Sequence, residues 1–202
     1  PIEQAGTGPA EDSPPRRLVE DFLRACAAGY SDDFMTAREY LLPAAAAIWK
    51  PEAAVFVYSG PDAPSVNSPD DSESSSVNVA VTAALTATLD DAGILTRTSS
   101  GVQEIHFELQ KDPDGQWRIA RLDDGIILSE SYFTSAYQPM QLFFLAPDRQ
   151  SLVPDPRWYP RRRLASHLVN GLLGGPSETI RDAVYSAFND SLQLPTQGVE
   201  IV

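Results

Sequence analysis

A stretch of strict alternation between residues 77 and 90 constrains the fold of this chain more than any other feature. Apolar side chains occupy every second position, and small or polar residues stand between them. A period of two residues is typical of a β-strand that buries one face. We therefore predict one long strand whose buried face is formed by Val77, Val79, Val81, Ala83, Leu85, Ala87 and Leu89.

Two helices are predicted before this strand. The first begins around Ser13, which is a candidate N-cap followed by two prolines, and ends at Gly29. The second begins at the acidic pair 32–33, because carboxylates favour a helix N-terminus, and is broken by Pro43. A further helical turn is expected over 44–49.

Shorter strands are predicted around the long one. Apolar or alternating patterns indicate strands at 55–58, 94–98, 105–109 and 117–122, whereas 61–76 is rich in Pro, Ser and acids and is expected to be a mobile loop. Helices followed by a meander of strands predict an α+β fold, in which helices pack in a curved antiparallel sheet shaped like a cone.

A second, smaller α/β unit is predicted after about residue 138. A strand at 142–146 precedes an extended stretch containing four prolines, and a helix follows over 164–173, ended by Gly174 and Gly175. The unit is expected to be truncated, because the chain ends where a strand begins. The last expected elements are a helix from Ser177 with Ile180, Val184 and Phe188 on one side, and strands at 192–194 and 199–201.

A basic run, "RWYPRRRLASHLVNGLLGGPS" over 157–177, covers the end of the extended stretch and the helix that follows it. It stands in a chain of net charge -13. An acidic chain with a pI near 4.4 does not have the broadly basic surface of a general nucleic-acid binder. The run is either a set of arginines in surface ion pairs within the chain or an exposed basic patch. Such a patch would contact an acidic partner or lie close to anionic lipid headgroups. The candidate contact residues are Arg157, Trp158, Tyr159, Arg161, Arg162 and Arg163.

No set of residues in the sequence assembles a catalytic or metal site, and no cofactor is expected. His106 is expected to be a solvated histidine on a polar strand face, and His167 a half-buried packing residue. The sequence Asp123-Asp124-Gly125 is typical of a turn, although paired carboxylates could serve acid–base chemistry. Cys26 is alone, so neither a disulfide within the chain nor a cysteine-based metal site is possible.

Three stretches together resemble the actinobacterial lipoprotein LpqB family. They are "TAREYLLPAAAAIWKP" (36–51), "QWRIARLDDGIILS" (116–129) and the segment from Leu142 that begins "LFFLAPDRQSLVPDP". The last is similar to the GerMN domain, whose Leu-x-x-Leu-Leu-x-Gly-Pro-Ser motif corresponds to Leu168–Ser177 with one extra glycine. The resemblance implies a flexible tether over 1–13, an NTF2-like domain over 14–138 and part of a GerMN domain over 139–202.

The resemblance also implies a function that the residues alone do not. Family members carry a signal peptide and a lipidated cysteine upstream, lie on the outer face of the cell membrane and are thought to modulate a sensor kinase of the MtrA/MtrB two-component type. We therefore expect a non-enzymatic extracytoplasmic module that binds the outer domain of such a kinase. Two alternatives stay open: an NTF2-like domain that binds or converts a small molecule, and a cell-wall glycan binder that uses Trp49, Trp158 and Tyr159 as stacking platforms.

Overall fold

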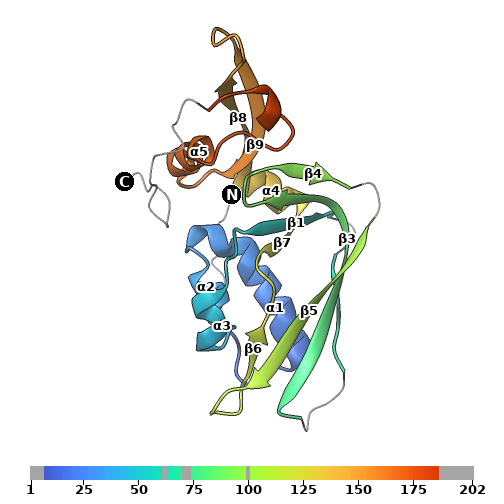
Figure 1. Cartoon of the computed structure of the whole chain (residues 1–202). Helices are drawn as coiled ribbons and strands as arrows, with labels where there is room; N and C mark the ends of the chain where they lie inside the picture. The colour runs from blue at the N-terminus through green and yellow to red at the C-terminus, as the bar shows by residue number, and fades with distance from the viewer. Residues whose placement is uncertain (1–6, 61–62, 70–73, 99–100, 187–202) are drawn as a thin grey trace. The chain divides into compact units, whose positions relative to one another are not determined.

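The chain folds into two compact units of α+β structure, in a computed structural model that describes residues 7–60, 63–69, 74–98 and 101–186 (Figure 1). The first unit contains Pro1–Thr88 and Arg97–Phe133, and the second contains Leu89–Thr96 and Thr134–Val202. The boundary expected between residues 138 and 139 falls within a strand of the second unit. Among the described residues, no helix combines the length and apolar character needed to cross a membrane.

Helix α1 of the first unit begins and ends close to where the sequence predicts. It starts at a proline, which suits a first helical turn, and Gly29 follows its last residue. The prediction of Ser13 as its N-cap is wrong, because Pro14 occupies that position and no side chain caps the helix. The helical segments of this unit are α1 (Pro15–Ala28), the 3-10 turn η1 (Gly29–Ser31), α2 (Met35–Arg38) and α3 (Pro43–Ile48).

The predicted second helix is much shorter than expected. Phe34 takes a left-handed conformation with φ of 60°, and its N–H donates to the carbonyl of Gly29, so α2 starts only at Met35. Asp32 still serves the helix start, because its carboxylate accepts a 3.0 Å hydrogen bond from the N–H of Thr36. The helical turn expected after Pro43 is confirmed as α3.

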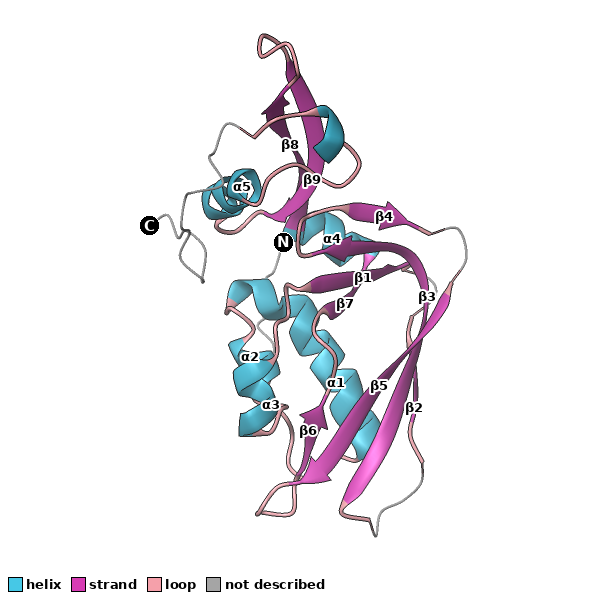
Figure 2. Ribbon diagram, in the orientation of Figure 1, coloured by secondary structure: helices cyan, strands magenta, loops and turns pink. Residues whose placement is uncertain are grey.

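The larger sheet has the order β6-β5-β3-β1-β7, and β2 and β4 also pair with β3 (Figure 2). The end of β3 and most of β4 fall within Leu89–Thr96 of the second unit. The prediction of a purely antiparallel meander is wrong, because β7 pairs with β1 in parallel, with Val55 opposite Ile126. The predicted loop over 61–76 contains a short strand, β2. The strands are β1 (Ala54–Tyr58), β2 (Ser65–Asn67), β3 (Ser76–Asp90), β4 (Leu95–Arg97), β5 (Val102–Lys111), β6 (Trp117–Arg121) and β7 (Ile126–Ser129).

Strand β3 confirms the predicted alternation and supplies much of the core. Its apolar positions are buried along the strand, and it pairs with β5 so that Val79 lies opposite Phe107. Phe22 of α1 packs on this face, with its ring centroid 5.9 Å from Phe107 and 5.5 Å from Trp49. Burial of aromatic and branched side chains between α1 and one face of the sheet therefore holds the first unit together.

The second unit is built on a two-stranded antiparallel hairpin. The helix predicted over 164–173 is confirmed, but the helix expected from Ser177 is wrong over the described residues, where Val184 is extended and Tyr185 bridges Leu145 of the hairpin. Phe188 and the strands expected at 192–194 and 199–201 lie outside the described residues. The segments are α4 (Glu130–Ala136), which crosses the division between the units, β8 (Tyr137–Leu145), β9 (Leu152–Pro160), α5 (Leu164–Leu173) and η2 (Arg181–Ala183).

The packing of Phe22 yields a prediction about stability. Phe22→Ala should lower the free energy of unfolding by about 3–5 kcal/mol, because it removes a ring from the centre of an aromatic cluster. Urea unfolding monitored by far-ultraviolet circular dichroism measures the change. Val102→Ala is the matched control, since Val102 is 73% exposed and its truncation should change the free energy by less than about 0.5 kcal/mol. Equal effects of the two substitutions would contradict this description of the core.

Candidate partner-contact site

The basic run predicted from the sequence passes from β9 through a short turn into α5. The arginines of the run therefore lie in two different environments. Arg157 lies within β9 and is 3% exposed, whereas Arg161, Arg162 and Arg163 lie in the turn and are all exposed. We refer to Arg161, Arg162 and Arg163 as the arginine cluster.

Arg157 forms a buried ion pair with Asp155. The two residues are two positions apart on β9, so both side chains point to the same face of the strand. The Nη2 atom of Arg157 donates to Oδ2 of Asp155 at 2.7 Å, and the side chains are 3% and 2% exposed. Arg157 and Tyr159 therefore contribute to the interior of the second unit rather than to its surface, and the prediction that they belong to an exposed contact patch is wrong.

Further polar groups complete the surroundings of this pair. Arg157 also donates to the carbonyls of Ala92 and Gly175, and Oδ2 of Asp155 accepts a 2.8 Å hydrogen bond from the N–H of Ser177. Burial alone raises the pKa of the Asp155 carboxyl, but the bonds from Arg157 and Ser177 outweigh it and lower the pKa below 3.8. The pair thus joins β9 to two segments that are distant in the sequence.

The segment Leu89–Thr96 is held to the hairpin by backbone contacts as well. The N–H of Trp158 donates to the carbonyl of Gly93 at 2.7 Å. A Cβ atom at Gly93 would lie only 2.9 Å from the carbonyl oxygen of Trp158, and the φ of 82° there suits glycine. This close approach explains why a turn that looks ordinary in the sequence belongs to the second unit.

Tyr159 packs against α5. Its ring stacks on His167 with centroids 6.1 Å apart, and its hydroxyl lies so close to Gly171 that a Cβ atom there would be 2.0 Å away. Burial lowers the pKa of His167, and the positive charge of Arg163 lowers it further. His167 is therefore a half-buried, neutral packing residue near neutral pH, in agreement with its predicted role.

Arg161 is exposed but has a structural task at the end of α4. Its Nε donates to the carbonyl of Ser135 at 3.0 Å, and its Nη1 donates to the side chain of Gln138 at 3.0 Å. A cation is favourable at a helix C-terminus, where carbonyl groups have no partner within the helix. Arg161 thus fixes the turn in which Arg162 and Arg163 follow.

The start of α5 places the last two arginines on the surface. Arg163 occupies the N-cap position with φ of 52°, and no side chain caps the helix. Its carbonyl accepts the first helical hydrogen bond, from the N–H of His167 at 3.2 Å. Because the helix start is mildly unfavourable for cations, Arg162 and Arg163 gain little from the helix itself. Both side chains are exposed to solvent.

The glycan-binding alternative loses two of its three platforms. Trp49 is 3% exposed and packs between Phe22 and Phe34, and Tyr159 is 5% exposed. A stacking platform must present a free ring face to a sugar, so neither residue can serve as one. Trp158 alone among the three is half-buried.

The residues considered for catalysis have other roles. The carboxylate of Asp124 accepts a hydrogen bond from the N–H of Lys50 at 2.8 Å, which is the turn role favoured by the sequence. His106 is 66% exposed and lies 3.2 Å from Glu104.

An open hollow at the end of β2 is lined by His106, Asn78 and Arg16. Asn78 and His106 lie on the face of β3 and β5 that is opposite their buried aliphatic side chains. Among the described residues, no group of His, Cys, Asp or Glu could hold a metal ion.

Asp155 and Ser177, which surround Arg157, were not predicted from the sequence as site residues. A signal for Asp155 was present, because Asp-Pro-Arg within an extended stretch places an acid and a base on one face. Nothing in the sequence indicates the contact with Ser177, since it depends on how α5 returns to the hairpin.

Comparison with known proteins identifies the chain's relatives. The family model described as "Lipoprotein LpqB, N-terminal domain" matches residues 8–134. The chain is 30% identical to the lipoprotein LpqB of Bifidobacterium longum, over 96% of this chain and 34% of that protein. It is 32% identical to that of Thermobifida fusca, over 85% and 28% of the two chains, and 28% identical to that of Mycobacterium tuberculosis, over 92% and 31%.

The similarity extends into the second unit, because the match to the first of these relatives covers nearly the whole chain. The names of these relatives are those of a lipoprotein and not of an enzyme. The chain spans about a third of the length of the curated relatives it matches. No solved structure matches it.

The buried ion pair yields a prediction that a double-mutant cycle can check. Arg157→Met and Asp155→Leu should each lower the free energy of unfolding by about 3–5 kcal/mol, because each leaves the other charge buried without its partner. The double variant should lose less than the sum, since it leaves neither charge unpaired. Near-ultraviolet circular dichroism in urea measures all three. Additive losses would show that the two residues do not act as a pair.

The lowered pKa of Asp155 predicts how stability depends on pH. The folded-state pKa lies below the ordinary value of 3.8, so the contribution of the carboxylate is present above that value and is lost as the pH falls through the folded-state pKa. The free energy of unfolding of the wild type should therefore fall more steeply below pH 3.8 than that of Asp155→Asn. Urea unfolding at a series of acidic pH values compares the two. If the free energies of unfolding of the two proteins changed in parallel with pH, the lowered pKa of Asp155 would be contradicted.

Proposed function

The chain belongs to the actinobacterial LpqB lipoprotein family, and from this premise we propose that it is a non-enzymatic extracytoplasmic module that binds and modulates a membrane sensor kinase. The parent protein is anchored to the outer face of the cell membrane by an N-terminal lipid, and the kinase is of the MtrA/MtrB two-component type. The observation that supports this proposal most is the match to lipoproteins of one family over most of the chain.

The two units are assigned the domain types expected for this family. The first is an NTF2-like domain, since helices pack against one face of a sheet whose long strand β3 pairs with four others. The family match ends at residue 134, one residue after the first unit ends. The second unit is part of a GerMN domain, with the hairpin β8–β9 leading into α5 and the glycine-containing motif at its end.

The arginine cluster is the proposed contact surface for the kinase. Its three side chains are exposed and consecutive, and they stand out on a chain with a net charge of -13. Such a local concentration of positive charge attracts an acidic patch on a partner and repels basic ones, which favours one docking orientation. Arg161 also holds the turn through the end of α4, so only Arg162 and Arg163 are changed in the test below.

Binding of the complete extracytoplasmic lipoprotein to the purified outer domain of the kinase tests the proposal. Arg162→Ala/Arg163→Ala should weaken the affinity measured by calorimetry about tenfold, because each exposed ion pair contributes roughly 0.2–1 kcal/mol. Raising the salt concentration should weaken wild-type binding, and it should reduce the difference in affinity between the wild type and the double variant. Arg161 is left in place so that the fold of the turn is not disturbed.

Arg121→Ala is the matched control, because its side chain is 81% exposed on β6 of the first unit. It should leave the affinity unchanged. Equal weakening by the control would mean that net charge rather than the arginine cluster is responsible. Absence of binding by the wild-type lipoprotein would refute the proposed function itself.

A further inference from the structure

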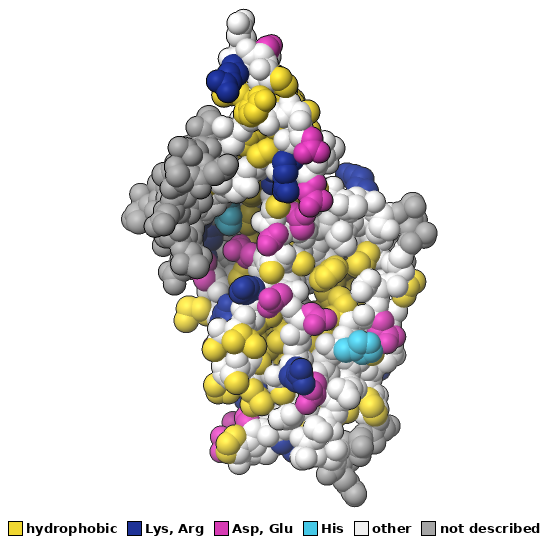
Figure 3. Space-filling model, in the orientation of Figure 1, with side chains coloured by type: hydrophobic (Ala, Val, Ile, Leu, Met, Phe, Trp, Pro, Cys, Tyr) yellow, Lys and Arg dark blue, Asp and Glu magenta, His cyan; other side chains and the backbone are white. Residues whose placement is uncertain are grey.

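An apolar surface on α2 and α3 is not explained by the packing of the first unit. Helix α3, Pro43–Ile48, has no polar side chain, and its outward positions stay accessible to solvent. Ile48 is 75% exposed, and Met35 of α2 is 69% exposed. Figure 3 shows hydrophobic side chains gathered over α2 and α3. We define the apolar patch as Met35, Pro43, Ala44, Ala47 and Ile48.

The packing beneath the apolar patch holds the start of α2 near the end of α3. The rings of Phe34 and Trp49, which precede Met35 and follow Ile48 in the chain, are in edge contact at 6.2 Å. Arg38 of α2 donates to the carbonyls of Ala46 and Trp49 and thereby ties α2 to the end of α3. The patch is therefore fixed by the core rather than formed by loose side chains.

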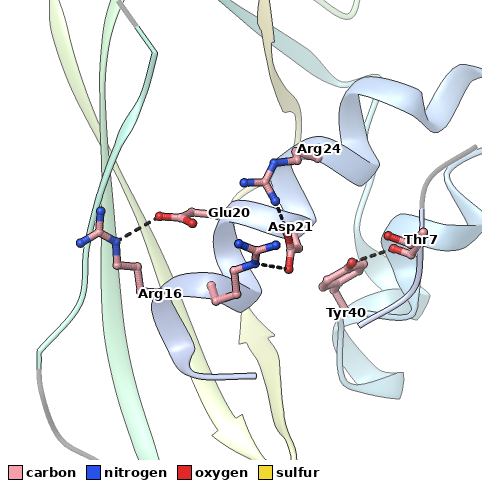
Figure 4. A network of polar contacts seen from close by, with 7 residues as sticks. Thr7, Arg16, Glu20, Asp21, Arg24 and Tyr40 are labelled. Carbon is pink, nitrogen blue, oxygen red and sulfur yellow. Dashed lines mark hydrogen bonds and ion pairs between the residues drawn. The ribbon is translucent and has the colours of Figure 1, made fainter. Parts of the chain in front are cut away.

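The N-terminal segment leads away from this same region. The hydroxyl of Tyr40, in the connection between α2 and α3, donates to the carbonyl of Thr7 at 2.7 Å (Figure 4). Thr7 is the first described residue, so the described chain starts beside the connection between α2 and α3. Asp12 is held to Gln116 by two hydrogen bonds, which fixes the next part of the segment as well.

We propose that the apolar patch rests on the lipid bilayer to which the parent protein is anchored. This inference relies on the lipid-anchoring part of the proposed function, because the proposed anchor precedes Thr7 in the chain and Thr7 lies beside the connection between α2 and α3. Exposed Met and Ile side chains on a short helical face suit the boundary between headgroups and acyl chains. The charged residues that border the patch have both signs, namely Asp33, Glu39, Arg38 and Lys50. The contact therefore depends on apolar burial and is insensitive to salt, unlike that of the arginine cluster.

Site-specific fluorescence on vesicles tests this placement. An environment-sensitive dye is attached to Met35→Cys or Ile48→Cys in the chain with an N-terminal histidine tag. The chain is then tethered to vesicles of phosphatidylcholine and phosphatidylglycerol doped with a nickel-chelating lipid. Cys26 stays unlabelled, because it is 1% exposed and its burial raises the pKa of the thiol. Val102→Cys is the matched control, since Val102 is equally exposed on β5.

The dyes at 35 and 48 should shift to shorter wavelengths on tethering and lose roughly half of their emission to a lipid-borne quencher, because an interfacial side chain lies about 5–10 Å deep. The dye at 102 should not change, and added salt should have no effect. Lack of quenching at 35 and 48, or equal quenching at all three positions, would overturn the inference. It would also be overturned if the dyes at 35 and 48 responded only when the outer domain of the kinase was added, since the patch would then bind protein.

A second variant keeps the test independent of labelling. Met35→Gln/Ile48→Gln should weaken partition of the untethered chain onto the same vesicles about tenfold or more, because two apolar side chains no longer gain from burial. Unchanged partition would contradict the inference. The vesicle experiments use an artificial tether or none and contain no kinase. Failure of the membrane contact is therefore a separate result from failure of kinase binding.

Discussion

The first unit depends on the burial of one face of β3. The strand runs for fifteen residues and pairs with β5 along one edge and with β1 and β2 along the other. A shift of its register by one residue would turn the whole aliphatic face toward water, so the pairing is strongly determined. Phe22 of α1 packs on that face, and Tyr40 and Trp49 pack in turn against the ring of Phe22.

The second unit has a small apolar core, and a polar interaction completes it. Within the described part of this unit, four buried residues form the core: Leu142, Phe144, Tyr159 and Val184. Beside them the Asp155–Arg157 pair joins β9 to the turn at Ala92 and to the segment after α5. A buried pair is costly to desolvate unless its donors and acceptors find partners, and most of them do here. One arginine of the basic run is thus used inside the unit, which leaves the arginine cluster on its surface.

The sequence predicted those parts of the fold that depend on local pattern. The alternation in β3, the helical stripes of α1 and α5 and the proline-rich extension of β9 arise from residues that are close in the chain. Strand β7 was missed because all four of its residues are buried and its partner β1 lies far away in the sequence. The helix expected from Ser177 is wrong because Val184 and Tyr185 follow the hairpin instead of continuing a helical turn.

The candidate contact site was also predictable only in part. Clustered arginines in an acidic chain indicated a special region, but the sequence could not tell which of them were buried. That distinction depends on a strand, a turn and a helix start that follow one another within a few residues. Hydrogen exchange of the complete lipoprotein, with and without the outer domain of the proposed sensor kinase, tests whether the arginine cluster is a contact surface. Slower exchange is expected at the turn before α5 and at the start of that helix. Unchanged exchange there, with protection confined to other regions, would contradict it.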